Sequence, residues 1–466
     1  MNKMEKSEMK EDFSYKRSSS YGVGQLSDIT AYQTFTFLVF TFYYAVIGIN
    51  ILAIMVAFIL WALWNSFNDS LIGFLSDRTH TRWGRRIPWI MISLCPLALS
   101  VFLLFTPPLA FEITNNLANF IYFMIIIVVF ELFFTMYDLN FTALFPELFI
   151  TVKERTKGNN VRQIFAILGL IMAFVLPGLF ISDYSDPSSL GEYQVFGIVI
   201  AIIILIPGLI FLKFSPREKA EFREDYRTAP PFFESIKTCM KSKSFAWYIP
   251  AEVANWFVYG ILPAIVPLYG KYVLNITDTL LLSLLLGIAF ISAAIFMTIL
   301  WKPLVQKIGP RKSWLISMSI WVIILSLLMI IGDPISGMIV FFLMGIGLSG
   351  SLYIIDIVIS DIVDEDEVKT GTRREGAYYG VNMFLMHLST VVVFLVIGPV
   401  FLISDWYEFN PEQVPISSLR ILISIFPIIA LLIALFVIYK YPLDGERLKE
   451  VKAQRERIHQ EKKSKI

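Results

Sequence analysis

The residues best suited to chemistry are polar side chains inside long apolar runs. Asn65 and Asp69 are four residues apart, so they share one face if their run is helical, and Thr135 and Asp138, three apart, do the same in a later run. Carboxylates with an amide and a hydroxyl supply hard oxygen donors, which suit a small cation or a proton relay. These four residues predict a binding site for a coupling cation. The alternative is an interhelical hydrogen-bond clamp that carries no ion.

Other ionisable groups also interrupt apolar runs. An ionised side chain in hydrocarbon costs on the order of 3 kcal/mol, so each is a candidate functional residue. His387 is the one histidine of three in such a run, and imidazole titrates near neutral pH. The remaining candidates are Asp28, Glu131, Glu252, Asn255 and Asp356. For Glu131 and Glu252 a place in a water-filled vestibule is an equal alternative, and Asp356 suits a gate as well as a substrate contact.

Twelve apolar runs position these residues. Most of them reach the ~20 residues that cross a bilayer as a helix, which predicts an all-α integral membrane protein. The predicted spans are 23–47, 50–76, 87–106, 117–149, 161–182, 194–213, 245–271, 279–301, 313–332, 336–360, 376–403 and 418–440.

The distribution of charge predicts the orientation of these spans. If both termini lie on one side, only Lys271 and Arg420 of the 39 Lys and Arg residues fall on the other side. Basic residues concentrate on the cytoplasmic side, so we expect a multi-pass protein of the cell membrane with both termini cytoplasmic. The charged, Ser-rich first twenty residues predict no cleavable signal peptide.

Composition supports contact with lipid. Apolar residues make up 56% of the chain and charged residues only 17%, which leaves too much apolar area for a water-soluble surface. A net charge of +1 gives no indication of nucleic-acid binding. The two cysteines, Cys95 and Cys239, show no metal-binding spacing and are expected to be packing residues. We expect no enzymatic activity, no cofactor and no metal beyond a possible coupling Na⁺.

The spans fall into two sets of six. Short basic turns around Gly84 and Gly309 occupy equivalent places in the two sets, which favours two related six-helix bundles, the major facilitator architecture. The predicted organisation is a cytoplasmic tail at 1–22, a bundle at 23–213, a cytoplasmic loop at 214–244, a second bundle at 245–441 and a basic cytoplasmic tail at 442–466.

Two predicted cytoplasmic loops carry charges that suit a gate. The loop after span two holds Asp77, Arg78 and Arg85, and the loop after span ten holds Asp361, Asp364 and Arg373. Opposite charges from opposite halves are expected to pair when the cytoplasmic side is shut. Solvated loops are the alternative, since exposed ion pairs contribute only ~0–1 kcal/mol each.

Several motifs together resemble the glycoside-pentoside-hexuronide:cation symporters, the melibiose-permease group of the major facilitator superfamily. The resemblance covers nearly the whole chain. It rests on Asn68 to Gly73 with Asp77 to Thr79, Arg82 to Arg85 and Pro88-Trp89; on Tyr21 to Gly24; on Asp138 with Pro146 to Leu148, Arg155 and Arg162; and on Asp361 to Asp364 with Lys369 and Arg373 to Gly376.

The resemblance implies roles for individual residues. Asp69, Thr135 and Asp138 match cation-site positions, and Asp138 and Arg162 also match sugar-contacting positions. The departures are Asn65 in place of a second helix-two aspartate, His387 in place of a helix-eleven lysine, and Thr142 in place of a stacking tryptophan. Asp28 lies one position away from the helix-one sugar-binding aspartate.

We therefore expect a secondary active transporter that carries a small polar solute, a sugar or glycoside, in symport with H⁺ or Na⁺ by alternating access. Asp28, Asp138, Arg162, His387 and Thr142 are the expected substrate contacts, near mid-membrane between the halves. Fewer carboxylates and an imidazole favour H⁺, while Asp69 with Thr135 and Asp138 also suits Na⁺. The protein is expected to act as a monomer. The alternatives are a lysolipid or other amphiphile symporter of the same fold and a non-transporting membrane sensor.

Overall fold

The computed structural model describes residues 15–79, 81–108, 116–149, 152–214, 237, 239–371 and 374–464. These residues are almost entirely helical, and the two-residue bridge between Thr81 and Gly84 is the extended pairing found among them. The helices are α2 (Tyr15–Thr41), η1 (Phe42–Val46), α3 (Ile51–Asp77), α4 (Ile87–Leu104), α5 (Asn116–Leu148), α6 (Val152–Phe174), α7 (Pro177–Phe180), η2 (Pro187–Ser189), α8 (Leu190–Phe214), α10 (Lys243–Tyr272), α11 (Thr279–Phe296), η4 (Met297–Trp301), α12 (Lys302–Ile308), α13 (Pro310–Leu327), α14 (Pro334–Thr370), α15 (Glu375–Ile403), α16 (Ile416–Arg420), η5 (Ile421–Ile425), α17 (Phe426–Lys440) and α18 (Gly445–Ser464).

Each of the twelve predicted spans coincides with one of these helical segments, so the predicted all-α membrane fold is confirmed. In the described part of the chain, ten helices are long and apolar enough to cross a membrane. The first and ninth predicted spans, which correspond to α2 and α13, are not among the ten. α2 carries Gln25, Asp28 and Gln33, and α13 begins with Arg311 and Lys312, so both are more polar than a lipid-facing helix.

Some boundaries differ from the prediction. α2 begins at Tyr15 inside the predicted tail, and α14 continues to Thr370, so Asp361 and Asp364 lie on a helix and not in a loop. Residues 445–464 of the predicted tail form α18, which packs against α14. Ion pairs between these two helices, described below, account for the extension of α14 and for the position of α18. Most of the predicted loop 214–244 lies outside the described residues.

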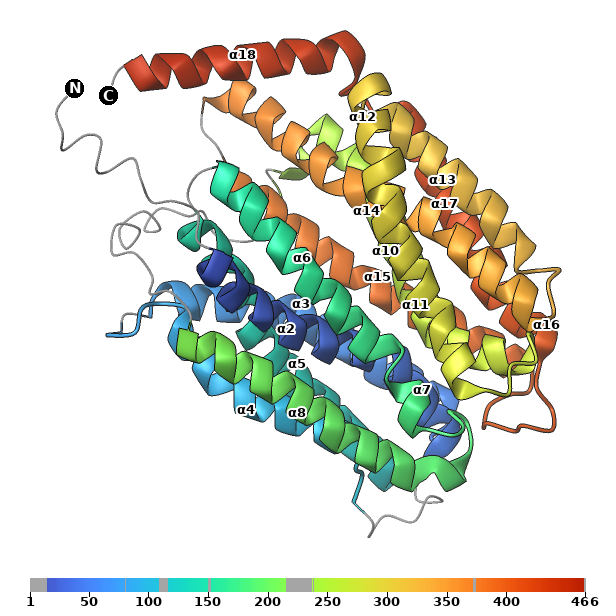
Figure 1. The fold of residues 1–466 in the computed structure, drawn as a ribbon. Helices are drawn as coiled ribbons and strands as arrows, with labels where there is room; N and C mark the ends of the chain where they lie inside the picture. Colours follow the sequence, from blue (N-terminus) through green and yellow to red (C-terminus); the bar gives the residue numbers. More distant parts are fainter. Residues whose placement is uncertain are drawn as a thin grey trace.

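The helices form two groups (Figure 1). In the first group α2 packs against α6 and α8, and α5 packs against α3 and α4. In the second, α14 packs against α11 and α13, and α10 packs against α15 and α17. Close approach inside the second group depends on glycine: a Cβ on Gly345 would lie 2.6 Å from the backbone nitrogen of Ala293. Small residues allow such contacts between membrane helices.

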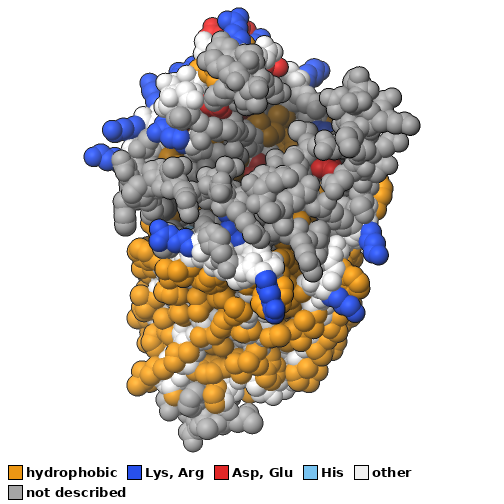
Figure 2. Space-filling model, turned by 90° about the vertical axis from the view of Figure 1, so that its left-hand side faces the viewer, with side chains coloured by type: hydrophobic (Ala, Val, Ile, Leu, Met, Phe, Trp, Pro, Cys, Tyr) orange, Lys and Arg blue, Asp and Glu red, His pale blue; other side chains and the backbone are white. Residues whose placement is uncertain are grey.

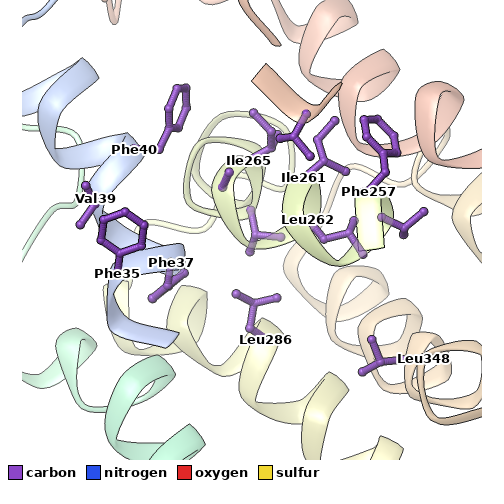
Figure 3. Packing of buried hydrophobic residues seen from close by; sticks show 14 of the residues in the cluster. Phe35, Phe37, Val39, Phe40, Phe257, Ile261, Leu262, Ile265, Leu286 and Leu348 are labelled. Atoms are coloured by element: carbon purple, nitrogen blue, oxygen red, sulfur yellow. The ribbon is translucent and has the colours of Figure 1, made fainter. Parts of the chain in front are cut away.

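The two groups meet through apolar side chains. α2 lies against α10 and α3 against α15. Phe40 of α2 lies with its ring centroid 5.9 Å from that of Phe394 of α15, and Ile261 and Ile265 of α10 belong to the same buried apolar cluster (Figure 3). Phe58 of α3 stacks on Phe394 of α15 with 3.9 Å between ring centroids. Neither bundle is therefore complete in isolation, because part of its apolar surface is covered by the other.

Polar contacts tie the groups together at one end, which we call the closed end and define by Tyr44, Asp183, Lys271 and Trp406. The Tyr44 hydroxyl donates to the carbonyl of Trp406 at 2.5 Å, and Lys271 Nζ lies 2.6 Å from Asp183 Oδ2. Thr279 donates to the carbonyl of Ser182 beside this ion pair. Because every one of these contacts joins the first group to the second, this end of the molecule is shut.

The surface agrees with a membrane environment. Apolar side chains cover the lower flank in Figure 2, and Lys and Arg side chains lie along the upper border of this apolar zone. Large exposed apolar side chains include Ile164, Val195, Ile299, Ile323 and Phe436. A surface of this kind is stable in contact with lipid and not with water.

Candidate functional site

A polar cluster connects α3 and α5 inside the first group. Thr135 Oγ1 lies 3.1 Å from Asp69 Oδ1 and 3.3 Å from Glu131 Oε1, so one hydroxyl joins two carboxyl groups. The indole N–H of Trp61 donates to Glu131 Oε2 at 2.8 Å. Asn68 donates to the backbone carbonyl of Glu131 at 3.2 Å. We call Trp61, Asn65, Asp69, Glu131 and Thr135 the α3–α5 cluster.

Asn65 belongs to this cluster because of its place on α3. It lies one turn after Trp61 and one turn before Asp69, and both of those side chains contact α5. The Oδ1 atoms of Asn65 and Asn68 are buried and have no hydrogen-bond partner among the described residues. The α3–α5 cluster therefore presents several oxygens toward one region, which fits a Na⁺ ion or a proton.

His387 of α15 brings the second group to this cluster. Its Nδ1 atom lies 3.3 Å from Asp69 Oδ2, although the ring N–H direction does not give a hydrogen bond. Both side chains are mostly buried, with 15% and 20% of their areas exposed. His387 thus places a titratable group of the second half beside Asp69 of the first.

A second set of polar residues surrounds Arg162 of α6. Its guanidinium acts electrostatically on Asp28 of α2, on Asp138 of α5 and, across the two halves, on Asp356 of α14. The carboxyl groups of Asp28 and Asp138 are close enough to interact electrostatically. Gln25 donates to Asp28 Oδ2 at 2.8 Å, and we call Gln25, Asp28, Asp138, Arg162 and Asp356 the Arg162 cluster.

The two clusters are neighbours. Tyr32 of α2 is close enough to interact electrostatically with Asp69, Glu131 and Asp138 together. Thr142 donates to Asp138 Oδ1 at 3.2 Å, one turn beyond it on α5. Phe145 supplies an aromatic face 5.1 Å from the Arg162 guanidinium carbon. A charged pair with an adjacent ring is a suitable surface for a polar solute with an apolar face.

The structure thus brings most of the predicted site residues into two adjoining clusters. Asp69, Asn65 and Thr135 lie in one, and Asp28, Asp138 and Arg162 in the other, with Thr142 and His387 at their edges. Residues of these clusters that sequence reasoning left undecided or did not consider are Trp61, Gln25, Glu131 and Asp356. For Glu131 a signal was present, because it lies one helical turn before Thr135 and hence on the same face.

Among the described residues, no group of three or more His, Cys, Asp or Glu side chains could hold a metal ion. A site for a transition metal would need such a group. The α3–α5 cluster has instead two carboxylates with a hydroxyl and amide oxygens. This donor set suits an alkali cation or H⁺.

The predicted gate residues lie in different surroundings. The side chains of Asp77 and Arg373 lie outside the described residues. Arg78 is exposed, and Arg85 is buried with 8% of its area exposed. Asp361 pairs with Lys452 at 2.9 Å and Asp364 with Arg455 at 2.6 Å, so two gate carboxylates contact α18. The expected partners were basic residues of the opposite half.

Further ion pairs hold the same end of α14. Glu365 pairs with Arg447 of α18 and with Lys369 one turn away. Arg374 donates to Asp366 through Nε at 2.8 Å and through Nη2 at 2.5 Å, and these bonds raise the pKa of Arg374. Bidentate Arg–carboxylate pairs are strong and directional. Several carboxylates at the acidic end of α14 are therefore paired with basic residues of their own half.

The chain matches the protein-family model described as MFS/sugar transport protein over residues 20–445. It is similar to the isoprimeverose transporter of Lactiplantibacillus pentosus, with 24% identity over 77% of this chain and 74% of the relative. It is also similar to the sodium-dependent lysophosphatidylcholine symporter 1 of Mus musculus, with 22% identity over 86% of this chain and 80% of the relative.

A solved structure shows the same fold. The crystal structure of a D-xylose-proton symporter superposes with a TM-score of 0.67 at 16% identity, covering 92% of this chain and 98% of the other. The match to the family model spans both groups of helices and both polar clusters. This chain therefore belongs to the MFS/sugar transport protein family and is a multi-pass membrane transporter, not an enzyme.

Proposed function

We propose that the protein is a secondary active transporter that carries a sugar or glycoside in symport with H⁺ or Na⁺ by alternating access. One observation supports this most directly. Asp69 of the first half and His387 of the second lie 3.3 Å apart, within a set of buried oxygens that suits a small cation. An ion bound there acts on both halves at once.

In this proposal the two clusters have different functions. The α3–α5 cluster holds the ion, and the Arg162 cluster binds the solute through Asp28, Asp138 and the guanidinium. An ion beside Asp69 stabilises the arrangement in which Asp138 and Arg162 receive the solute. Such differential affinity couples the two fluxes. The second carboxyl group of the α3–α5 cluster comes from Glu131 of α5. Asn65, on α3 with Asp69, contributes an uncharged amide oxygen.

The proposed orientation follows the charge distribution. The ends of the helices near α18 face the cytoplasm together with both termini, and the closed end faces outward. The described conformation is then shut on the outside. We propose that the transporter acts as a monomer in the cell membrane.

Transport by purified protein in lipid vesicles tests this function. The panel of labelled solutes includes isoprimeverose and D-xylose, each measured with and without a pH gradient and with Na⁺ or K⁺ outside. We expect at least one sugar to accumulate above its external concentration in response to one of the two ion gradients. Absence of gradient-driven accumulation for every sugar would contradict the symport of sugars, and a transport-inactive sensor would show no flux in any condition.

A second candidate cargo is an amphiphile such as a lysolipid. The observation in its favour is an almost wholly apolar pocket inside the second group, lined by Tyr259, Leu262, Leu286, Trp321 and Leu348 among others. Leu262, Leu286 and Leu348 project toward this region in Figure 3. Its lining suits a hydrocarbon group, and its volume of about 20 Å³ means that the pocket must widen before a chain can enter.

A bulky substitution in this pocket distinguishes the two candidate cargoes. We expect Leu286→Trp to abolish uptake of a labelled lysolipid, if the protein transports one, because the indole occupies the space of the chain. Sugar uptake by this variant should change less than about twofold, since the polar clusters are elsewhere. Ile291→Trp is the matched control, because Ile291 lies on the same helix with 43% of its area exposed. Lysolipid uptake that survives Leu286→Trp would exclude this pocket as the binding site.

A further inference from the structure

A third polar cluster lies inside the second group, apart from the two clusters assigned above. Its centre is Glu252 of α10, which has 1% of its area exposed. Glu252 Oε1 accepts the indole N–H of Trp256 at 3.0 Å and the amide of Asn382 of α15 at 3.3 Å. No Lys or Arg in the described part of the chain forms an ion pair with it.

The other polar atoms of this cluster lack partners. Glu252 Oε2, Asn382 Oδ1 and the hydroxyl oxygen of Tyr248 are buried and have no hydrogen bond among the described residues. Two of these three oxygens can only accept a hydrogen bond when the carboxylate is ionised. Each unpaired buried acceptor costs about 1–3 kcal/mol, so an ionised Glu252 in this arrangement is unfavourable.

One proton removes most of this cost. Protonation of Oε2 supplies a donor for Asn382 Oδ1, whereas the Tyr248 hydroxyl can donate to Oε2 in either form. Oε1 keeps both of its donors, Trp256 and Asn382, in the neutral form as well. The neutral carboxyl group therefore gives partners to more of these buried atoms than the carboxylate does, because only the neutral form offers a donor to Asn382 Oδ1.

The charged and titratable neighbours favour the same form. Those that act on Glu252 or on the adjoining Tyr248 are Asp356 of α14, Tyr379 of α15, and Tyr248 and Tyr259 of α10 itself. Near neutral pH the tyrosines are neutral, so Asp356 is the group among these that carries a negative charge. Asp356 also interacts electrostatically with Arg162, so the third cluster borders the Arg162 cluster.

We propose that Glu252 is a proton-binding site of the second half, occupied in the described conformation. The site takes a proton, with Tyr248 and Asn382 as its hydrogen-bond partners. This inference rests on the proposed ion-coupled function for its role in transport, whereas the presence of the proton is independent of that function.

α15 links this site to the α3–α5 cluster. Asn382 and His387 are five residues apart, about 7.5 Å along the helix axis. Asn382 contacts Glu252 of the second half, and His387 contacts Asp69 of the first. Loss of the proton from Glu252 therefore changes the contacts of the helix that carries His387 to the ion site.

Infrared difference spectroscopy on the purified full-length protein tests the proposal. The signal is the C=O stretching band of a protonated carboxyl group, recorded between neutral and alkaline pH in KCl and in NaCl. We expect a band in the wild type that is absent in Glu252→Gln, shifted in Glu252→Asp, and unchanged in Glu412→Gln, which alters an exposed glutamate. Identical difference spectra for the wild type and Glu252→Gln would overturn the proposal.

Further measurements distinguish failure of this proposal from failure of the proposed function and from misfolding of a variant. In Asp69→Asn the Glu252 band should persist, so failure of ion-coupled transport does not remove it. If NaCl abolishes the band at constant pH, the oxygens bind Na⁺ and the proton assignment is wrong. Glu252→Asp retains the carboxyl group, so its band also tests the assignment if Glu252→Gln melts at a lower temperature than the wild type.

Discussion

Asp69→Asn is expected to abolish accumulation of the transported solute while leaving its passive exchange across the vesicle membrane measurable. Asp69 accepts a hydrogen bond from Thr135 and lies 3.3 Å from His387 Nδ1, so in the proposed mechanism it is the acidic group through which the ion acts on both halves. Its neutral replacement keeps the size of the side chain but removes the charge. Coupling between two linked ligands is typically about 1–3 kcal/mol, so the dependence of solute affinity on the ion should fall by about 5–150-fold.

The measurement compares gradient-driven uptake with counterflow of the same labelled solute in vesicles. Asp405→Asn is a matched control, because Asp405 is exposed and has a positive φ of 55°, a conformation that Asn also tolerates. Asp138→Asn should likewise impair accumulation, through both the solute and the ion. If Asp69→Asn and Asp138→Asn each leave accumulation of every accepted solute intact, the two clusters do not have the roles proposed for them.

Reversing one charge of the Lys271–Asp183 pair should open the closed end. Lys271 Nζ lies 2.7 Å and 2.6 Å from the two carboxylate oxygens of Asp183 and 2.7 Å from Ser185 Oγ, and the pair is only 27% and 31% exposed. Lys271→Asp or Asp183→Lys places like charges at this contact, which costs several kcal/mol. Each 1.4 kcal/mol changes the ratio of conformations about tenfold, so the shut state should become a minor one.

Spin labels report this change. Cysteines at Ser188 and Thr277, exposed positions on the two halves, carry the labels in a background in which Cys95 and Cys239 are replaced. We expect the label-to-label distance to increase in each single variant and to return in the double variant with exchanged charges. Exchange of the exposed pair Glu446 and Lys449 should leave it unchanged. A distance that stays constant in both single variants would show that this ion pair does not hold the closed end shut.

The sequence predicted the spans well because a bilayer imposes a length and a composition on each one. The limits of the prediction are at the polar helices and the helix ends. α2 and α13 were predicted as spans although they are more polar than the other ten, and α14 continues past residue 360, where its acidic end is paired with α18. Those partners are about 90 residues away along the chain, and no local pattern indicates them.

For the candidate sites, too, local sequence patterns predicted shared helix faces but not the contacts between helices. Helical periodicity alone placed Asn65 with Asp69, and Thr135 with Asp138, on shared faces. It did not reveal that Thr135 contacts Asp69 while Asp138 lies beside Asp28, or that Glu131 joins the first cluster. Two residues three apart lie on one helix face, but they differ by about 4.5 Å along the helix axis and by about 60° around it. Each can therefore contact a different neighbouring helix.

The amino-acid sequence by itself determined that this is a multi-pass helical membrane protein, because apolar length and basic residues act through the bilayer and not through particular contacts. It also determined which polar groups are buried in the membrane. Only the tertiary structure decided how those groups pair: Asp69 with His387, Glu252 with Asn382, and Asp183 with Lys271. The physical reason is that each of these pairs joins segments distant in sequence, and the packing that brings them together is set by the shape of whole helix faces.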